Sequence, residues 1–253
     1  MLSPAEFGLQ AWSLLAVAPI IGSFLGVLVR RLPENRPLVW SRSRCETCGA
    51  ALSIPDLVPV LSWLATRGQC RHCGNRLGLF YPGIEIAALA LALIAVTNDE
   101  RAHAWLDCLL GWWLLALCWI DLRCYMLPDV LTLPLIVFGL LTAALFDPDA
   151  MLDRTLGTVF GYLAFLAIAA AYRAVRGREG LGGGDAKMLG AAGAWVGLTA
   201  LPQVILAASL AALLAAGWLY LSGVRLHAHS ALPFGPFIGA ALWAVWLFGP
   251  ISL

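Results

Sequence analysis

The chain has 253 residues, of which 61% are hydrophobic and only 12% carry a charge. Soluble domains contain about 25% charged residues, so this composition excludes a soluble globular protein and indicates that most of the chain lies in lipid. The formal net charge of +1 says little as a total, but the positions of the charges along the chain are informative.

Long apolar runs follow one another along the chain, and a membrane-spanning helix needs roughly 20 such residues. The first run, residues 7–29, ends at Arg30 and Arg31 and has no small-residue cleavage site. We therefore expect it to remain as a span and not to be removed as a signal peptide. The sequence predicts an all-α polytopic membrane protein with about eight transmembrane helices. If Leu201-Pro202 is a kink within one helix and not a turn between two, the number of transmembrane helices is seven, which is the alternative. The expected spans are residues 8–29, 83–97, 103–120, 130–146, 156–174, 186–200, 202–222 and 234–250.

Basic and acidic loops alternate through this eight-span arrangement. Of the 16 Lys and Arg residues, all but Arg101 and Arg154 fall on one side, and the opposite side is rich in Asp and Glu. Lys and Arg accumulate in cytoplasmic loops, so the basic side is expected to face the cytoplasm. Both termini then lie outside it.

Residues 30–82 form the one sizeable polar segment, which contains two Cys-x-x-Cys pairs. A piece of about 50 residues is too small for a core of its own and usually needs a metal or disulfides. A cytoplasmic location is reducing, which favours a structural Zn²⁺ site over disulfides, with a redox dithiol as the alternative. The Arg residues of this loop are expected to set topology and attract anionic lipid, or otherwise to form a docking face. The expected zinc ligands are Cys45, Cys48, Cys70 and Cys73.

Carboxylates are costly inside membrane spans, so each one is a functional candidate. Asp121, Asp129 and Asp185 lie at predicted cytoplasmic span ends, and Glu85 lies early in the second span. Two neighbouring carboxylates can hydrolyse a peptide bond, because one activates water while the protonated partner polarises the carbonyl or protonates the leaving amine. The glycines at 182–184 are expected to allow positive φ and close backbone approach beside Asp185. Helix N-capping is the structural alternative for Asp185 and the preferred interpretation of Asp129.

Two other protein classes compete with a protease. A cation transporter predicts polar residues near the middle of several spans, and the carboxylates here gather towards one face instead. A zinc-stabilised membrane scaffold without chemistry leaves the glycine run before Asp185 unexplained.

Short motifs in order along the chain resemble those of the type IV prepilin peptidases, which are GxGD aspartyl membrane proteases. Residues 182–185 fit GxGD, and Lys187 continues the motif as GxGDxK. Asp121 with Leu127-Pro128-Asp129 is similar to the family's DxxxxxLPD segment. Further matches are Gly22-Ser23-Phe24-Leu25, Arg31-Leu32-Pro33, both Cys-x-x-Cys segments, Tyr81-Pro82 with Glu85, and Pro233-Phe234-Gly235-Pro236.

The resemblance implies that Asp121 and Asp185 are catalytic, with Gly182, Gly184, Lys187, Asp129 and Glu85 in supporting roles. It implies cleavage of the basic leader from type IV prepilins or type II secretion pseudopilins at the cytoplasmic face of the bacterial inner membrane. Bifunctional members then methylate the new N-terminus with S-adenosylmethionine. Gly26 stands where the family usually has Asn, so a peptidase without methyltransferase activity is the alternative.

Three parts follow from this interpretation. Residues 1–29 form the first span, residues 30–82 the cytoplasmic zinc domain and residues 83–253 the membrane-embedded protease. The expected partners are prepilins or pseudopilins and membrane lipid, and no nucleic acid is expected. The methyl-donor site and the oligomeric state have no sequence signature.

Overall fold

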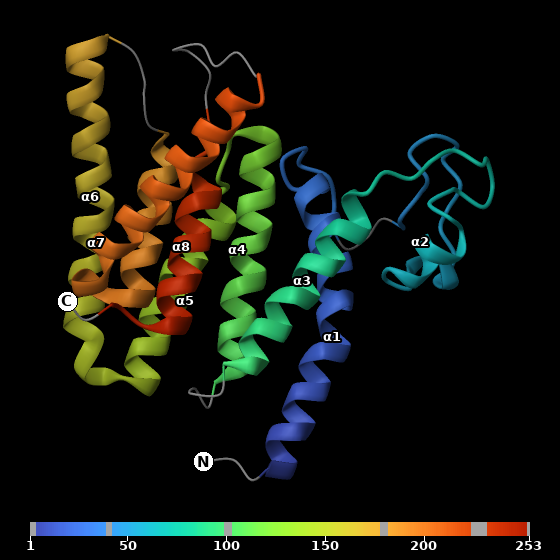
Figure 1. Ribbon diagram of the computed structural model, residues 1–253, viewed down its shortest axis with the longest axis horizontal. Helices are drawn as coiled ribbons and strands as arrows, with labels where there is room; N and C mark the ends of the chain where they lie inside the picture. The colour runs from blue at the N-terminus through green and yellow to red at the C-terminus, as the bar shows by residue number, and fades with distance from the viewer. Residues whose placement is uncertain (1–3, 39–41, 99–102, 178–181, 224–231, 252–253) are drawn as a thin grey trace. The chain divides into compact units, whose positions relative to one another are not determined.

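The computed structural model describes residues 4–38, 42–98, 103–177, 182–223 and 232–251 (Figure 1). This part of the chain is built of helices, with two isolated β-bridges and no strand. The chain forms two compact units, residues 1–116 and residues 117–253, whose boundary falls within one helix, α4 (Ala104–Cys124). The all-helical fold predicted from the sequence is confirmed.

The first unit contains α1 (Pro4–Arg31), η1 (Ile54–Leu57), α2 (Leu61–Ala65), α3 (Phe80–Thr97) and the first part of α4. Helix α1 packs closely against α3. A Cβ atom on Gly22 would lie 2.6 Å from the Cα atom of Glu85, so only glycine permits this approach. Trp112 of α4 donates a hydrogen bond of 2.9 Å to the carbonyl of Ala88, which ties α4 to α3.

The second unit contains the end of α4, α5 (Asp129–Phe146), η2 (Pro148–Ala150), α6 (Met151–Arg176), α7 (Gly183–Leu221) and α8 (Gly235–Phe248). Helices α5, α6 and α8 all pack on α7. The buried Trp195 donates a hydrogen bond of 3.0 Å to the carbonyl of Leu135, and its ring meets Trp246 edge to face at 5.2 Å. This indole therefore links α7 to both α5 and α8.

Helix α7 is broken at Gly197, where φ is 82° and ψ is 172°. A Cβ atom on Gly161 of α6 would lie 2.9 Å from the Leu189 carbonyl oxygen and 3.0 Å from Leu201 Cδ2. In a straight helix those two residues would be about 18 Å apart, so the chain must turn back at Gly197. Asp153 accepts hydrogen bonds from the Thr199 N–H and hydroxyl groups and thereby caps the second limb. The break predicted at Leu201-Pro202 was therefore misplaced, since Pro202 lies inside the second limb.

Six helices within the described residues are long and apolar enough to cross a membrane: α1, α3, α4, α5, α6 together with η2, and α7. Helix α8, with 14 residues, is shorter but also apolar. Because α7 holds two limbs, 183–196 and 198–221, all eight predicted apolar segments fall on helices. These helices indicate an integral membrane protein.

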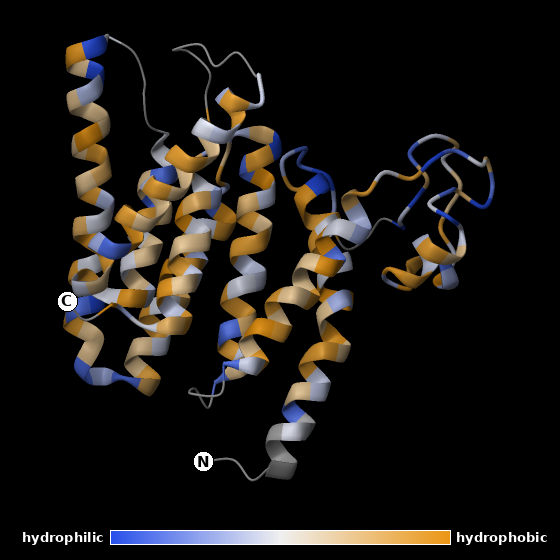
Figure 2. Ribbon diagram, viewed as in Figure 1, coloured by the Kyte–Doolittle hydropathy of each residue, from blue (hydrophilic) through white to orange (hydrophobic). Residues whose placement is uncertain are grey.

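Charged residues in the second unit gather at the two ends of its helices (Figure 2). The end of α4 and the starts of α5, α7 and α8 meet at one end, as the contacts described below establish. The turn between α5 and α6 and the first turn of α6 form the other end, which carries Asp147, Asp149, Asp153 and Arg154. This separation agrees with the predicted alternation of loops, while the assignment of the basic end to the cytoplasm stays a prediction.

Candidate functional site

Asp121 lies in the last turn of α4 and is only 5% exposed. The backbone N–H of Gly235, the first residue of α8, donates a hydrogen bond of 3.0 Å to its Oδ2 atom. A Cβ atom on Gly235 would lie 2.7 Å from the same oxygen. The site therefore requires glycine at position 235 if the carboxylate is to keep this position.

Asp185 lies half-buried in the first turn of α7, which begins at Gly183. Its own N–H donates to the carbonyl of Gly182 at 3.1 Å, and Gly182 is the N-cap residue. The N-cap interpretation of Asp185 was therefore wrong by three positions. A carboxylate in the first helical turn is still favoured by the positive end of the helix dipole.

The glycines before Asp185 act through their small size. Gly182 has φ −73°, and none of residues 182–184 has the positive φ that was predicted. A Cβ atom on Gly184 would lie 3.0 Å from Cβ of Leu127. The close approach at Gly184 is therefore to the Leu127 side chain and not to another backbone, and it occurs in an ordinary helical start.

Leu127 joins the two carboxylate-bearing segments. Its buried side chain lies against Gly184, beside Asp185, and a Cβ atom on Gly235 would lie 3.3 Å from its Cδ1 atom. The structure thus brings the two predicted catalytic residues to one place, where the end of α4 meets the starts of α7 and α8.

Asp129 serves a different purpose from the one predicted. Helix α5 begins at Asp129 itself, its N-cap residue is Pro128, and no side chain caps it. The capping interpretation of Asp129 was therefore wrong. Its Oδ1 atom instead accepts a hydrogen bond of 2.5 Å from Nζ of Lys187, so this ion pair ties the start of α5 to the start of α7.

Glu85 belongs to the first unit, where it contacts the polar loop and α1. It is 5% exposed and accepts a hydrogen bond of 2.7 Å from the backbone N–H of Val60. The side chain of Ser23 on α1 is a further hydrogen-bond partner. Glu85 therefore fastens the polar loop to α1 and α3.

The four predicted cysteines form one cluster, in which all sulfur atoms lie within 4.8 Å of one another. Cys45 and Cys73 are 4.0 Å apart, and a tetrahedral zinc site with Zn–S bonds of about 2.3 Å needs roughly 3.8 Å. The backbone N–H groups of Cys48 and Thr47 lower the pKa of Cys45 to about 6, which favours the thiolate that a metal binds. The donor set therefore fits a four-thiolate metal site.

Both halves of the cluster have the same backbone conformation. Gly49 and Gly74 each have φ 70° and each donates a 2.9 Å hydrogen bond to the carbonyl of the first cysteine of its pair. One β-bridge closes each half, Arg44 with Ala51 and Gln69 with Arg76. Asn75 donates a 2.6 Å hydrogen bond to Thr47 and joins the halves. Each Cys-x-x-Cys-Gly segment of the sequence therefore folds into the same turn.

Comparison with known proteins identifies the family. Residues 16–98 match the model of the bacterial peptidase A24 N-terminal domain, and residues 108–217 match the type IV leader peptidase family. The chain belongs to the type IV leader peptidase family. Among its relatives, the prepilin leader peptidase/N-methyltransferase of Burkholderia pseudomallei is 37% identical, and the alignment covers 96% of this chain and 86% of the relative. The protein of the same name from Dickeya chrysanthemi is 38% identical, and the alignment covers 90% of this chain and 89% of the relative. The one from Pseudomonas aeruginosa is 36% identical, with 91% of this chain and 87% of the relative covered. No solved structure matches significantly.

Three residues of this type IV leader peptidase family member had no role in the sequence-based interpretation. Gly235 lies in a motif that was matched, but its contact with Asp121 depends on the fold. Trp195 organises the helix core around α7. Asp107 is fully buried in the first turn of α4, and its position inside an apolar run is a signal that could have singled it out.

Proposed function

We propose that this chain is a membrane aspartyl peptidase that removes the leader from type IV prepilins or type II secretion pseudopilins, and that it then methylates the new N-terminus. The observation that carries the peptidase proposal is the buried carboxylate of Asp121, held by the Gly235 N–H and packed through Leu127 beside the helix start that presents Asp185. The names of the relatives support the substrate and the second activity.

Asp121 and Asp185 would divide the work of peptide hydrolysis. Neighbouring carboxylates resist double ionisation, so one is ionised while the other keeps its proton. The ionised group removes a proton from water, whose oxygen attacks the scissile carbonyl carbon. The protonated group donates its proton to the carbonyl oxygen, which gives a diol intermediate. The first group then passes the proton that it took from water to the leaving amine as the C–N bond breaks, and the second group regains a proton from a diol hydroxyl. The Gly235 N–H would hold Asp121 in the orientation that this exchange needs.

The location of the two aspartates suits a leader substrate. Both lie at helix ends. In the proposed orientation, these helix ends lie at the cytoplasmic face of the bacterial inner membrane, and both chain termini lie on the periplasmic side. A basic leader would stay in the cytoplasm while the apolar pilin segment lies in the bilayer. The scissile bond would then reach the aspartates at the membrane interface.

Residues 30–82 would form the cytoplasmic zinc domain and residues 83–253 the protease. Cys45, Cys48, Cys70 and Cys73 would hold the Zn²⁺ ion, whose binding stabilises a domain too small for its own core. S-adenosylmethionine would supply the methyl group, and we assign no residue of this chain to it. At Gly26, the Tyr81 ring lies where a side chain would begin, since a Cβ atom there would be 2.9 Å from Cδ1 of the ring.

Mass spectrometry of a purified prepilin incubated with the protein in nanodiscs tests this function. We expect loss of the leader alone without S-adenosylmethionine, and the further mass of one methyl group when it is added. Loss of the leader with no methylation would support the peptidase-only alternative. An intact substrate, under conditions in which the Pseudomonas aeruginosa relative cleaves it, would contradict the proposal.

A further inference from the structure

The polar loop exposes a group of large apolar side chains in residues 54–64, which we call the apolar segment. Ile54 is 83% exposed, Leu61 64% and Leu64 56%, and Leu57 and Val58 are also exposed. Figure 2 shows the strongly hydrophobic residues of this domain concentrated in and beside α2, with hydrophilic residues along the surrounding loops. Large exposed apolar side chains grouped in one short segment indicate a candidate interaction site.

A hydrogen bond fixes this segment against a membrane-spanning helix. Val60, in the middle of the segment, donates its backbone N–H to Oε2 of Glu85 at 2.7 Å. Glu85 lies in the second turn of α3, about 7 Å along the axis from the first residue of that helix. Val60 also has φ 58°, a rare conformation for a β-branched residue, which the surrounding structure must maintain. The apolar segment is therefore held beside the membrane-entry end of α3.

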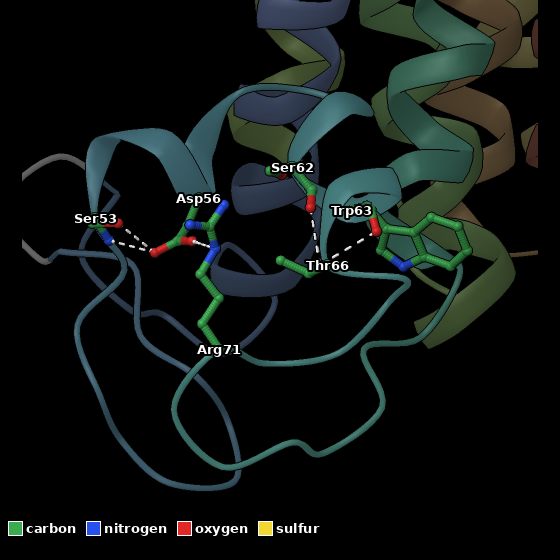
Figure 3. A network of polar contacts seen from close by, with 6 residues as sticks. All are labelled: Ser53, Asp56, Ser62, Trp63, Thr66 and Arg71. Atoms are coloured by element: carbon green, nitrogen blue, oxygen red, sulfur yellow. Dashed lines mark hydrogen bonds and ion pairs between the residues drawn. The ribbon is translucent and has the colours of Figure 1, made fainter.

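Polar contacts bind the other side of the segment to its own domain (Figure 3). Asp56 accepts hydrogen bonds from the Ser53 hydroxyl at 2.5 Å and the Ser53 N–H at 3.0 Å, and it pairs with Arg71 Nε at 2.9 Å. Thr66 donates to the carbonyl of Ser62 at 2.9 Å. These contacts satisfy polar groups inside the domain, so the exposed leucines remain for an outside partner.

We propose that the apolar segment inserts into the headgroup region of the lipid bilayer and acts as an interfacial anchor for the cysteine domain. Interfacial elements bury their apolar face about 5–10 Å into the headgroup boundary, and the Glu85 contact holds the segment near the first turns of a helix apolar enough to span the membrane. The exposed Leu79 at the start of α3 continues the apolar surface into the span. Arg67 and Arg76 in the same domain are exposed and suit anionic headgroups.

Depth-dependent quenching tests this anchor in the full-length chain. An environment-sensitive fluorescent amino acid replaces Leu61, and the protein is placed in nanodiscs of phosphatidylcholine and phosphatidylglycerol. The matched control carries the same label at Ala51, an exposed residue of the first cysteine half. We expect lipids with a shallow nitroxide to quench the Leu61 label several-fold more than the Ala51 label, and aqueous iodide to show the reverse order.

Equal iodide quenching at both positions, with no quenching by lipid, would overturn the proposal. Protection of Leu61 that arises only after prepilin is added would also overturn it, and would assign the segment to substrate docking. A second label at Ile54 repeats the measurement at another position of the segment. Unchanged metal content of each labelled protein establishes that the cysteine domain is folded, so a change in quenching reports location.

Discussion

The backbone N–H of Gly235 donates a 3.0 Å hydrogen bond to Oδ2 of Asp121, across 114 residues of chain. This contact joins the Pro-Phe-Gly-Pro turn at the start of α8 to the carboxylate at the end of α4. Neither motif predicts this contact by itself, because only the fold brings the two segments together. The glycine holds the aspartate and leaves no room for a side chain at its own position.

Replacement of Gly235 by alanine should therefore impair cleavage. The new Cβ atom would lie 2.7 Å from the Asp121 carboxylate and would displace it. A hydrogen bond to a charged group contributes about 1.5–3 kcal/mol, so we expect leader cleavage to fall roughly tenfold or more. Initial rates with a purified prepilin measure the change. Gly217→Ala is the matched control, since a Cβ atom there meets nothing within 4 Å. Full activity of Gly235→Ala would show that Asp121 does not depend on this contact.

Asp129→Asn should be much milder than a change at a catalytic aspartate. Its ion pair with Lys187 is partly exposed, with 58% and 29% of the two side chains accessible. Such pairs contribute about 0.2–1 kcal/mol, which corresponds to a loss of no more than about fivefold in rate. Lys187→Gln should give the same loss, and the double variant should lose little more than either. Complete inactivation by Asp129→Asn would assign it a direct part in the chemistry.

Gly197→Ala should destabilise the second unit. The turn of α7 needs φ 82°, and a Cβ atom there would collide with the Asp153 carboxylate that caps the second limb. Strained positions of this kind cost about 1–3 kcal/mol. Thermal unfolding in detergent should show a lower midpoint than the wild type and than Gly217→Ala. An unchanged midpoint would mean that the limbs of α7 do not depend on this turn.

Removal of one cluster cysteine should release the metal. Cys45→Ser is expected to lower the zinc content below one ion per chain, whereas Cys124→Ser, an exposed cysteine outside the cluster, should not. Zinc binds thiolates, so its affinity should fall as the pH falls from about 8 to about 5, where protons compete for the ligands. Release to a chromophoric chelator follows both effects. Equal zinc content in the two variants would contradict the assignment of the four-cysteine cluster as the metal site.

Sequence patterns predicted the long helices, the cysteine cluster and the pairing of Asp121 with Asp185. Apolar length located each long helix of the described residues, including both limbs of α7, because lipid demands long apolar segments with internal hydrogen bonds. The cysteine spacing predicted the cluster, since each Cys-x-x-Cys pair is a local turn that needs only one long-range encounter. The pairing of Asp121 with Asp185 was expected from motif resemblance, while their separation was not predicted; the contacts through Leu127 bring their two segments together.

Other features depend on long-range packing that no local pattern encodes. The break in α7 falls at Gly197 and not at Leu201-Pro202, because Asp153 from α6 is placed to cap the limb that follows. Asp129 turns to Lys187 instead of capping α5, since the start of α7 lies beside it. The role of Gly235 depends on the packing of the start of α8 against the end of α4, which the sequence does not encode locally.

The paired action of Asp121 and Asp185 is tested most directly by prepilin cleavage with the Asp121→Asn and Asp185→Asn proteins. Mass spectrometry would follow leader removal, with Asp149→Asn, an exposed residue at the opposite helix ends, as the control. Zinc content and unfolding temperature would establish that each variant is folded. We predict that each catalytic variant loses at least about a thousandfold in rate while the control stays active. A folded variant of either aspartate that cleaves within tenfold of the wild type would contradict the assignment.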